Sequence, residues 1–101
     1  MAIKVTIETQ RFTTKTQATE HFTKMLARYA NRQDVTGADF DDLYSLLEKH
    51  PRAGEKIGAG VKRIFADWIR DGARCFWVER IDGTKEDFSI RKCIDTASVD
   101  F

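Results

Sequence analysis

The second half of the chain alternates strand-forming runs with Asp-Gly dipeptides, and this spacing strongly limits how it can fold. Residues 61–70 (VKRIFADWIR) and 74–81 (RCFWVERI) are rich in β-branched and aromatic residues. Asp71-Gly72 lies between the two runs, and Asp82-Gly83 follows the second. Because Asp-Gly favours tight hairpin turns, the pattern predicts an antiparallel meander that ends in a short strand near residues 85–88.

The first half shows the periods of a strand and a helix. In residues 3–8 the apolar and polar side chains alternate, which is typical of a half-buried strand. Thr14 with Gln17 three residues later is a capping-box signal for the start of a helix. The apolar stripe that follows predicts an amphipathic helix over residues 15–31, and it consists of Ala18, Phe22, Met25, Leu26 and Tyr29.

A second helix is predicted after a connection over residues 31–37. Asp39 is the expected N-cap. The helix should end before Pro51, because a residue that precedes proline, here His50, favours an extended conformation. Its apolar stripe consists of Phe40, Leu43, Leu46 and Leu47.

The remaining segments complete the expected fold. Residues 52–60 contain three glycines and no clear period, which predicts a loop, and residues 89–97 are expected to form a short final helix. A chain of 101 residues with 42% hydrophobic residues and a single proline can build one core. We therefore expect a single α+β domain over residues 1–101, in which an antiparallel sheet packs against two helices of the N-terminal half and a short C-terminal helix.

Charged side chains are unevenly distributed along the chain. The formal net charge is only +1, which is not typical of a nucleic-acid-binding protein. Residues 1–33 carry six Lys or Arg against two Glu, residues 34–48 carry five acidic side chains and no basic one, and residues 52–63 carry four basic side chains against one Glu. The surface potential should therefore be polarised, with an acidic region between basic ones.

The segment Lys56-Ile57-Gly58-Ala59-Gly60 allows two interpretations. Glycine N–H groups can approach a phosphate, and Lys56 could add its charge. However, the GxxxxGK[ST] pattern of nucleotide-binding loops is absent, and the segment leads into a strand rather than a helix. We expect a tight turn with positive φ at Gly58 and Gly60, with contact to a nucleic-acid phosphate as the alternative.

The histidines and cysteines are expected to be structural. His50 has the pKa range of a proton-transfer residue, but no paired nucleophile or base stands out. The His50-Pro51 pair is instead expected to stop a helix, with the imidazole bonded to helix-end carbonyls, and His21 is expected at the surface. A zinc site that uses Cys75 and Cys93 with the histidines is disfavoured because no CxxC or HxxxH spacing occurs, so both cysteines are expected to be buried thiols.

A group of carboxylates follows the second strand-forming run. Asp82 and Gly83 are expected to form a hairpin turn, and Asp87 or Ser89 is expected to cap the last helix. Catalytic carboxylates or Mg²⁺ ligands, with Glu86 added to the set, are the alternative.

An ordered set of residues extends over positions 50–93. They are His50, Pro51, Lys56, Ile57, Gly58, Gly60, Cys75, Phe76, Val78, Arg80, Asp82, Gly83, Thr84, Asp87, Phe88, Ser89, Lys92 and Cys93. This order resembles the DCL (defective chloroplasts and leaves) family, a small domain found alone in bacteria and plastids and also in the tail of the largest subunit of plant RNA polymerase V. The resemblance implies a role in RNA metabolism, because plastid members are linked to ribosomal RNA maturation. It carries over no catalytic or binding residue.

Basic side chains give the clearest functional hypothesis. They are interleaved with aromatic residues in the second half, and this combination can hold phosphates and stack bases. The alternative is that the aromatic residues form the core and the charges are merely solvated. The candidate RNA-binding residues are Lys56, Lys62, Arg63, Arg80 and Lys92.

Together with the resemblance to the DCL family, these observations predict a non-enzymatic domain that binds RNA or an RNA–protein complex. The resemblance implies that it acts as an accessory in ribosomal RNA maturation. The alternative is a protein-interaction module that docks on a polymerase or a ribosome-assembly partner, and a hydrolase built around His50 is a third class. We expect no cofactor, no metal, no membrane contact and a monomer. No signal or transit segment is visible, which predicts a cytoplasmic protein of the bacterial type.

Overall fold

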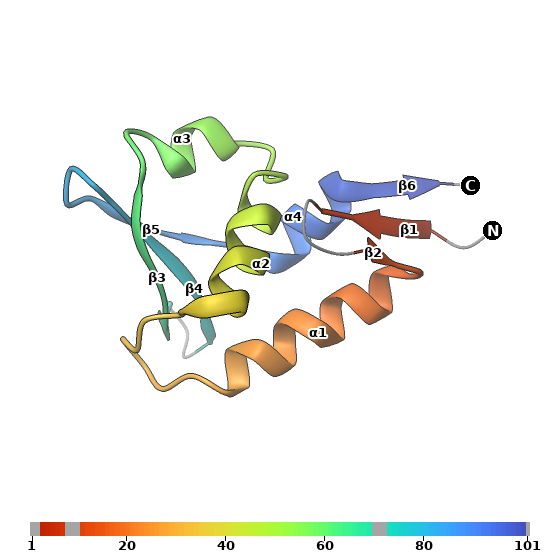
Figure 1. The fold of residues 1–101 in the computed structure, drawn as a ribbon, viewed down its shortest axis with the longest axis horizontal. Helices are drawn as coiled ribbons and strands as arrows, with labels where there is room; N and C mark the ends of the chain where they lie inside the picture. The colour runs from red at the N-terminus through yellow and green to blue at the C-terminus, as the bar shows by residue number, and fades with distance from the viewer. Residues whose placement is uncertain (1–2, 8–10, 70–72, 101) are drawn as a thin grey trace.

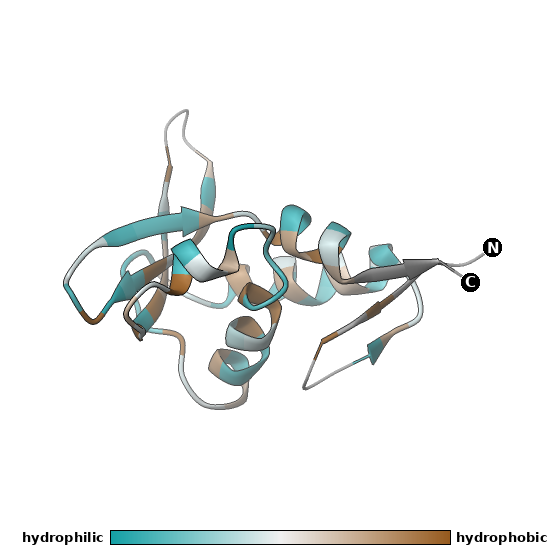
Figure 2. Ribbon diagram, turned by 90° about the horizontal axis from the view of Figure 1, so that it is seen from above, coloured by the Kyte–Doolittle hydropathy of each residue, from teal (hydrophilic) through white to brown (hydrophobic). Residues whose placement is uncertain are grey.

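Two small antiparallel sheets lie at opposite ends of the molecule (Figure 1). Between them lie the helices α1 (Lys15–Ala27), α2 (Gly37–Leu47) and α4 (Ile90–Ala97). The computed structural model describes residues 3–7, 11–69 and 73–100. Viewed from above, the sheet beside the two chain ends extends outward from the central helices along the long axis (Figure 2). The principal extents are 42 × 28 × 27 Å, so the domain is elongated along this axis.

The predicted meander forms one of the two sheets. It consists of β3 (Val61–Trp68), β4 (Arg74–Arg80) and β5 (Lys85–Phe88), in the order β3-β4-β5 with antiparallel pairing. The Asp82-Gly83 turn is present, with φ +87° at Gly83. The predicted Asp71-Gly72 turn lies outside the described residues. The α+β fold and the meander are therefore confirmed.

The second sheet joins the two ends of the chain. β1 (Ile3–Thr6) is its central strand and pairs with β2 (Arg11–Phe12) and β6 (Ser98–Asp100). Ile3 lies opposite Asp100, and Val5 lies opposite both Phe12 and Ser98. The alternating pattern of residues 3–8 predicted β1, but the two short partner strands carry no such pattern.

Helix α1 (Lys15–Ala27) begins as predicted and ends earlier. Thr14 caps it by accepting a hydrogen bond from the Gln17 N–H at 3.1 Å. The predicted extension to residue 31 is wrong, because the chain after Ala27 turns to follow the edge of β3. There the Arg32 N–H donates to the Ala66 carbonyl, and Arg32 adopts φ +67°.

Helix α2 (Gly37–Leu47) has Thr36 at its N-cap position. The expected N-cap role of Asp39 is therefore wrong, and Asp39 lies in the first turn of the helix instead. Its carboxylate accepts hydrogen bonds from the Arg28 guanidinium at 3.0 Å and from the Tyr29 hydroxyl at 2.7 Å. Asp39 thus connects α2 to the end of α1 rather than capping its own helix.

The predicted loop over residues 52–60 is also wrong in its first part, which forms the short helix α3 (Ala53–Ile57). Only Gly58 and Gly60 of its three glycines have positive φ, whereas Gly54 lies inside the helix. A glycine is tolerated in a single helical turn when contacts outside the turn hold it. The final helix α4 (Ile90–Ala97) is confirmed, and Ser89 caps it by accepting from the Lys92 N–H at 3.2 Å.

The core lies where the helices cover one face of the β3–β5 sheet. Its largest fully buried side chains are Phe22, Met25, Leu43, Leu46, Leu47, Ile64, Phe76, Phe88 and Ile94. The opposite face of the sheet, which we call the outer face, carries Arg63, Phe65, Trp77 and Glu79 in neighbouring positions. Phe76 and Trp77 are adjacent in β4 and therefore lie on different faces.

Candidate nucleic-acid interface

Lys56 is buried and holds α3 against the meander. Its ammonium group donates to Glu86 Oε1 at 2.8 Å and to the backbone carbonyl of Asp87 at 2.9 Å. Arg80 joins the same network, with one terminal nitrogen 2.9 Å from the Lys56 carbonyl and 3.2 Å from Glu86 Oε2. The hydrogen bond from Lys56, followed by that from Arg80, lowers the pKa of Glu86. Lys56 and Arg80, two candidate RNA-binding residues, thus contact each other and Glu86.

The glycine-rich segment packs closely on the end of β4. Gly58 and Gly60 have φ +54° and +129°, the positive values that were expected. A Cβ at Gly58 would lie 2.8 Å from Arg80 Cδ, and one at Gly60 would lie 2.7 Å from Ile81 Cδ1. The N–H groups of the two glycines donate to the carbonyls of Gly54 and Ile57. They are therefore not free to bind a phosphate, and the turn interpretation accounts for both glycines.

His50 lies in a positively charged environment at the end of α2. It is 7% exposed, and its Nδ1 accepts a hydrogen bond from the Arg52 N–H at 2.9 Å. The expected bond to helix-end carbonyls is thus replaced by a turn in which the imidazole is the acceptor. Burial lowers the pKa of His50, and the positive charges of Lys56, Lys92 and Arg52 lower this pKa further. We call His50, Arg52, Lys56 and Lys92 the His50 cluster.

The lowered pKa of His50 predicts how the stability of the fold depends on pH. A histidine whose pKa is lower in the folded state than its ordinary value of 6.5 takes up a proton preferentially in the unfolded chain. Stability should therefore be retained above pH 6.5 and fall as the pH drops below that value. We expect urea midpoints measured between about pH 7.5 and about pH 5 to fall more for the wild type than for His50→Asn. Asparagine keeps an acceptor for the Arg52 N–H, so parallel curves would contradict this assignment.

Lys62 and Arg63 lie in a different place, beside the outer face of the meander. Arg63 donates to Glu79 and to Asp34, each at 2.7 Å, and its guanidinium lies 4.2 Å from the centre of the Phe65 ring. The Lys62 ammonium is 3.7 Å from Glu79. Carboxylates therefore balance both cations on this face.

The five candidate RNA-binding residues thus differ in their charge partners and do not form one surface, although Lys56 and Lys92 both belong to the His50 cluster. Lys56 and Arg80 are tied to Glu86, and Lys62 and Arg63 are tied to Glu79. Lys92 lies on α4, is exposed, and makes no ion pair with the described residues. Sequence analysis did not identify two residues around His50 and Lys56. They are Arg52, which lies beside His50, and Glu86 as the ion-pair partner of Lys56.

The other candidate ligands do not meet. His21, which was expected at the surface, is half-buried because α2 packs beside it, and its Nε2 lies 3.2 Å from Asp42 Oδ2. Cys93 is buried as predicted, whereas the prediction that Cys75 is buried is wrong, because it is only half-buried in β4. Burial raises the pKa of both Cys75 and Cys93 to about 12, which keeps the thiols protonated. Within the described residues, no group of three or more His, Cys, Asp or Glu side chains is arranged to hold a metal ion.

The carboxylates after β4 have structural contacts. Asp82 accepts hydrogen bonds from the N–H and the hydroxyl of Thr84, and the first of these donors lies 3.0 Å away. The hydrogen bonds from Thr84 lower the pKa of Asp82. Ser89 rather than Asp87 caps α4. In the part of the chain that the structure covers, no helix has the length and apolar character needed to cross a membrane.

Comparison with known proteins gives relatives in plants. Subunit 1 of DNA-directed RNA polymerase IV of Arabidopsis thaliana is 52% identical over 50 residues, which are 48% of this chain and 3% of the subunit. Protein EMBRYO DEFECTIVE 514 of the same plant is 34% identical over 91 residues, 85% of this chain and 44% of that protein. The chloroplastic protein DCL of Solanum lycopersicum is 43% identical over 52% of this chain and 24% of its own length. This chain therefore spans less than half of each of these relatives.

A solved structure and a family model agree with these matches. The solution NMR structure of an uncharacterised protein from Rhodospirillum rubrum superposes with a TM-score of 0.82 and 36% identity, and covers 89% of this chain and 86% of that one. The family model described as "Protein of unknown function (DUF3223)" matches residues 23–94. Subunit 1 of Arabidopsis RNA polymerase V matches as well, at 43% identity over 54% of this chain and 3% of the subunit. The chain belongs to the DUF3223 family, and its resemblance to the DCL proteins is confirmed.

Proposed function

We propose that this domain binds RNA without catalysing a reaction, and that the His50 cluster contacts the phosphate backbone. The observation that carries the proposal is the local charge. Three cations from α3, its preceding turn and α4 act on the His50 imidazole, whereas Glu86 is the acid that opposes them there. A concentrated positive potential attracts the phosphates of nucleic acids even when the net charge of the protein is small.

Each member of the His50 cluster has a distinct part in this proposal. Lys92 is exposed and free of ion pairs with described residues, so its ammonium can approach a phosphate directly. Arg52 is exposed, and its partner Glu55 is exposed as well, so a phosphate can replace this carboxylate at little cost. Because Nδ1 of His50 accepts the Arg52 N–H, the neutral ring carries its proton on Nε2 and presents a further donor. The charge of the buried Lys56 strengthens the local potential.

The same contacts support a non-enzymatic role. General acid–base catalysis needs a partner within hydrogen-bonding distance of the histidine. The hydrogen bond that the His50 imidazole makes among the described residues is with the Arg52 backbone, and Cys75 and Cys93 are kept protonated by burial. The names of two relatives, subunit 1 of RNA polymerases IV and V, are consistent with a function in RNA metabolism.

The test is the salt dependence of RNA binding. Fluorescence anisotropy with single-stranded RNA at several salt concentrations should give a log affinity that falls linearly with log salt, with a slope of about −0.7 per phosphate contact. Arg52→Gln combined with Lys92→Gln should reduce this slope by about 1.4, because two contacts are lost. Lys62→Gln is the matched control, since Glu79 already balances that exposed lysine.

Two results would contradict the proposal. One is binding no tighter than that of a basic control peptide at physiological salt. The other is an equal loss of affinity in Lys62→Gln and Lys92→Gln, which would show a response to overall charge alone.

Docking on a protein partner is the second candidate, and the surface supports it less. The exposed large apolar side chains of the described residues are Trp68 and Ile81, which are 51% and 65% exposed. Trp68 lies opposite Arg74 at the start of β4, whereas Ile81 follows the end of β4. Seven residues of strand, about 23 Å, separate these two ends. The two side chains therefore do not form one apolar patch, and salt-independent binding would be the sign of docking.

A further inference from the structure

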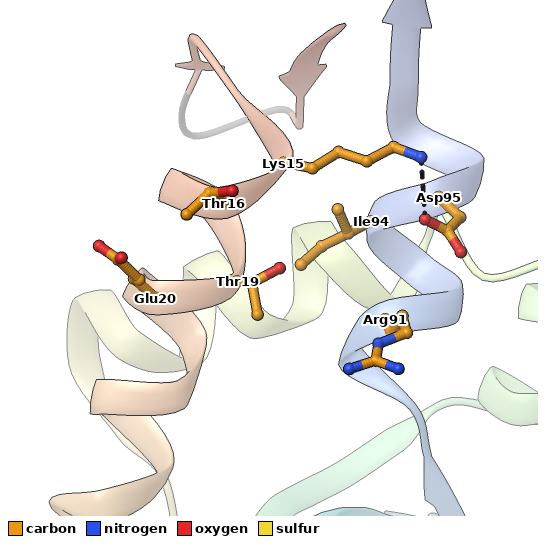
Figure 3. Close-up of a pocket in the computed structure, with 7 residues that line it drawn as sticks. All are labelled: Lys15, Thr16, Thr19, Glu20, Arg91, Ile94 and Asp95. Carbon is orange, nitrogen blue, oxygen red and sulfur yellow. Dashed lines mark ion pairs between the residues drawn. The ribbon is translucent and has the colours of Figure 1, made fainter.

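A groove runs between α1 and α4 and continues to the start of β4. Its first part is shown in Figure 3, where Thr16 and Thr19 of α1 face Ile94 of α4, and the ion pair between Lys15 and Asp95 spans one end at 3.1 Å. This part has a volume of about 310 Å³. Thr19 and Arg91 also line a second hollow of about 420 Å³, so the two hollows are adjacent.

The second hollow has an apolar wall and charged groups. Leu26, Ile69 and Ile90 supply apolar surface, and Arg74, Asp87 and Arg91 add charge. Its size suits a small ligand or a single unit of a larger one. A flat apolar body with polar groups at its edges would fit such a lining.

The charged groups of the second hollow have unused hydrogen-bonding capacity. Arg91 is exposed, and its side chain makes no hydrogen bond or ion pair with the described residues. Arg74 donates through Nε to Asn31 and through one terminal nitrogen to the Tyr29 carbonyl, which leaves its other terminal nitrogen without a described acceptor. Lys56 binds the backbone carbonyl of Asp87, not the carboxylate. Among the described residues, neither the Arg91 guanidinium nor the Asp87 carboxylate has an ion-pair partner. A ligand that carries both an anion and an N–H donor would satisfy both groups.

We propose that the second hollow binds one nucleotide, with its phosphate at Arg91 and Arg74, its base against Leu26, Ile69 and Ile90, and an amino group of the base at Asp87. This inference deepens the proposed RNA binding and rests on it. Lys92 of the His50 cluster follows Arg91 directly in α4, so one RNA strand can reach both sites. The same chemistry is present in a free nucleoside monophosphate and in a unit of RNA.

The experiment compares two free nucleotides and one short RNA on the 101-residue chain. NMR titration with CMP should shift the amide signals of Ser89, Ile90 and Arg91. UMP should bind more weakly, because its base has a carbonyl where cytosine has the amino donor. Arg91→Gln should weaken CMP binding about tenfold through loss of a charge-assisted contact. Lys24→Gln is the matched control, because Lys24 is an exposed residue of α1 that lines neither hollow.

The outcomes separate this inference from the proposed function. If an oligocytidine RNA binds with equal affinity to the wild type and to Arg91→Gln, and CMP shifts no signal, the nucleotide site is wrong while RNA binding stands. If CMP binds in the hollow but the RNA does not bind, the nucleotide site stands and the RNA proposal fails. If Arg91→Gln and Lys24→Gln weaken CMP binding equally, the loss reflects net charge and the proposed site is wrong. Equal affinity for CMP and UMP would overturn the contact at Asp87.

Discussion

Replacement of Lys56 by methionine is expected to lower the free energy of unfolding by about 3 kcal/mol. Methionine can fill the space of the aliphatic chain, but it cannot donate to Glu86 or to the Asp87 carbonyl. The carboxylate and the carbonyl would then lose a partner inside the protein, which costs more than the loss of an exposed ion pair. Glu86 keeps its hydrogen bond to Arg80 and is 30% exposed. The loss of unfolding free energy should therefore lie at the lower end of the range that is typical of broken buried ion pairs.

Urea unfolding of four variants, Lys56→Met, Glu86→Gln, their combination and Lys62→Met, tests this role. Lys62→Met, at an exposed lysine, should change stability by less than about 0.5 kcal/mol. Lys56→Met combined with Glu86→Gln should be less destabilised than the sum of the single changes, because the neutral amide removes the unpaired charge. A Lys56→Met protein with wild-type stability would show that the network does not hold α3.

Replacement of Gly58 by alanine should have the second large effect, and lower the free energy of unfolding by about 2 kcal/mol. Gly58 combines φ +54° with ψ −126°, a conformation that side chains disfavour, and its new Cβ would approach Arg80 Cδ to 2.8 Å. Arg80 cannot easily withdraw, because it donates to Thr84, Glu86 and the Lys56 carbonyl.

Gly54→Ala is the control for the Gly58 variant in the same short segment. Gly54 lies inside α3, and an added Cβ would meet nothing within 4 Å. Alanine should therefore be neutral there or stabilise the helix by up to about 1 kcal/mol. Thermal melting that ranks Gly58→Ala as no worse than Gly54→Ala would contradict the close approach of α3 to β4.

The sequence predicted those helices and strands whose residue pattern is local and long enough for its period to repeat. The Asp-Gly spacing predicted the meander, and the Thr14 capping box predicted the start of α1. The strands β2 and β6 have two and three residues, which is too short for a period, and they form because β1 supplies their hydrogen bonds. Helix α3, at five residues, is also too short to show a stripe and depends on contacts with β4 and β5.

The candidate site was harder to predict because sequence gives side-chain types but not their partners. Lys56 is charged and lies beside glycines, which is typical of an exposed loop, yet it is buried against an acid thirty positions away in the chain. Arg63 reads as a free cation until the fold brings Asp34 and Glu79 beside it. Lys92 keeps its predicted exposure. The turn glycines were predictable because positive φ is a local requirement.

Pairing of β1 with β6 places the first and last described residues on neighbouring strands, so that Ile3 lies opposite Asp100 and the two ends emerge side by side (Figure 1). A polypeptide that enters and leaves at one point can be built into a longer protein without forcing its neighbours apart. The spacing between paired strands, about 4.8 Å, is close to the reach of a single residue. A fold with this geometry can be inserted within a longer polypeptide or fused to one end of it. The matched segments within the far longer polymerase subunits illustrate this.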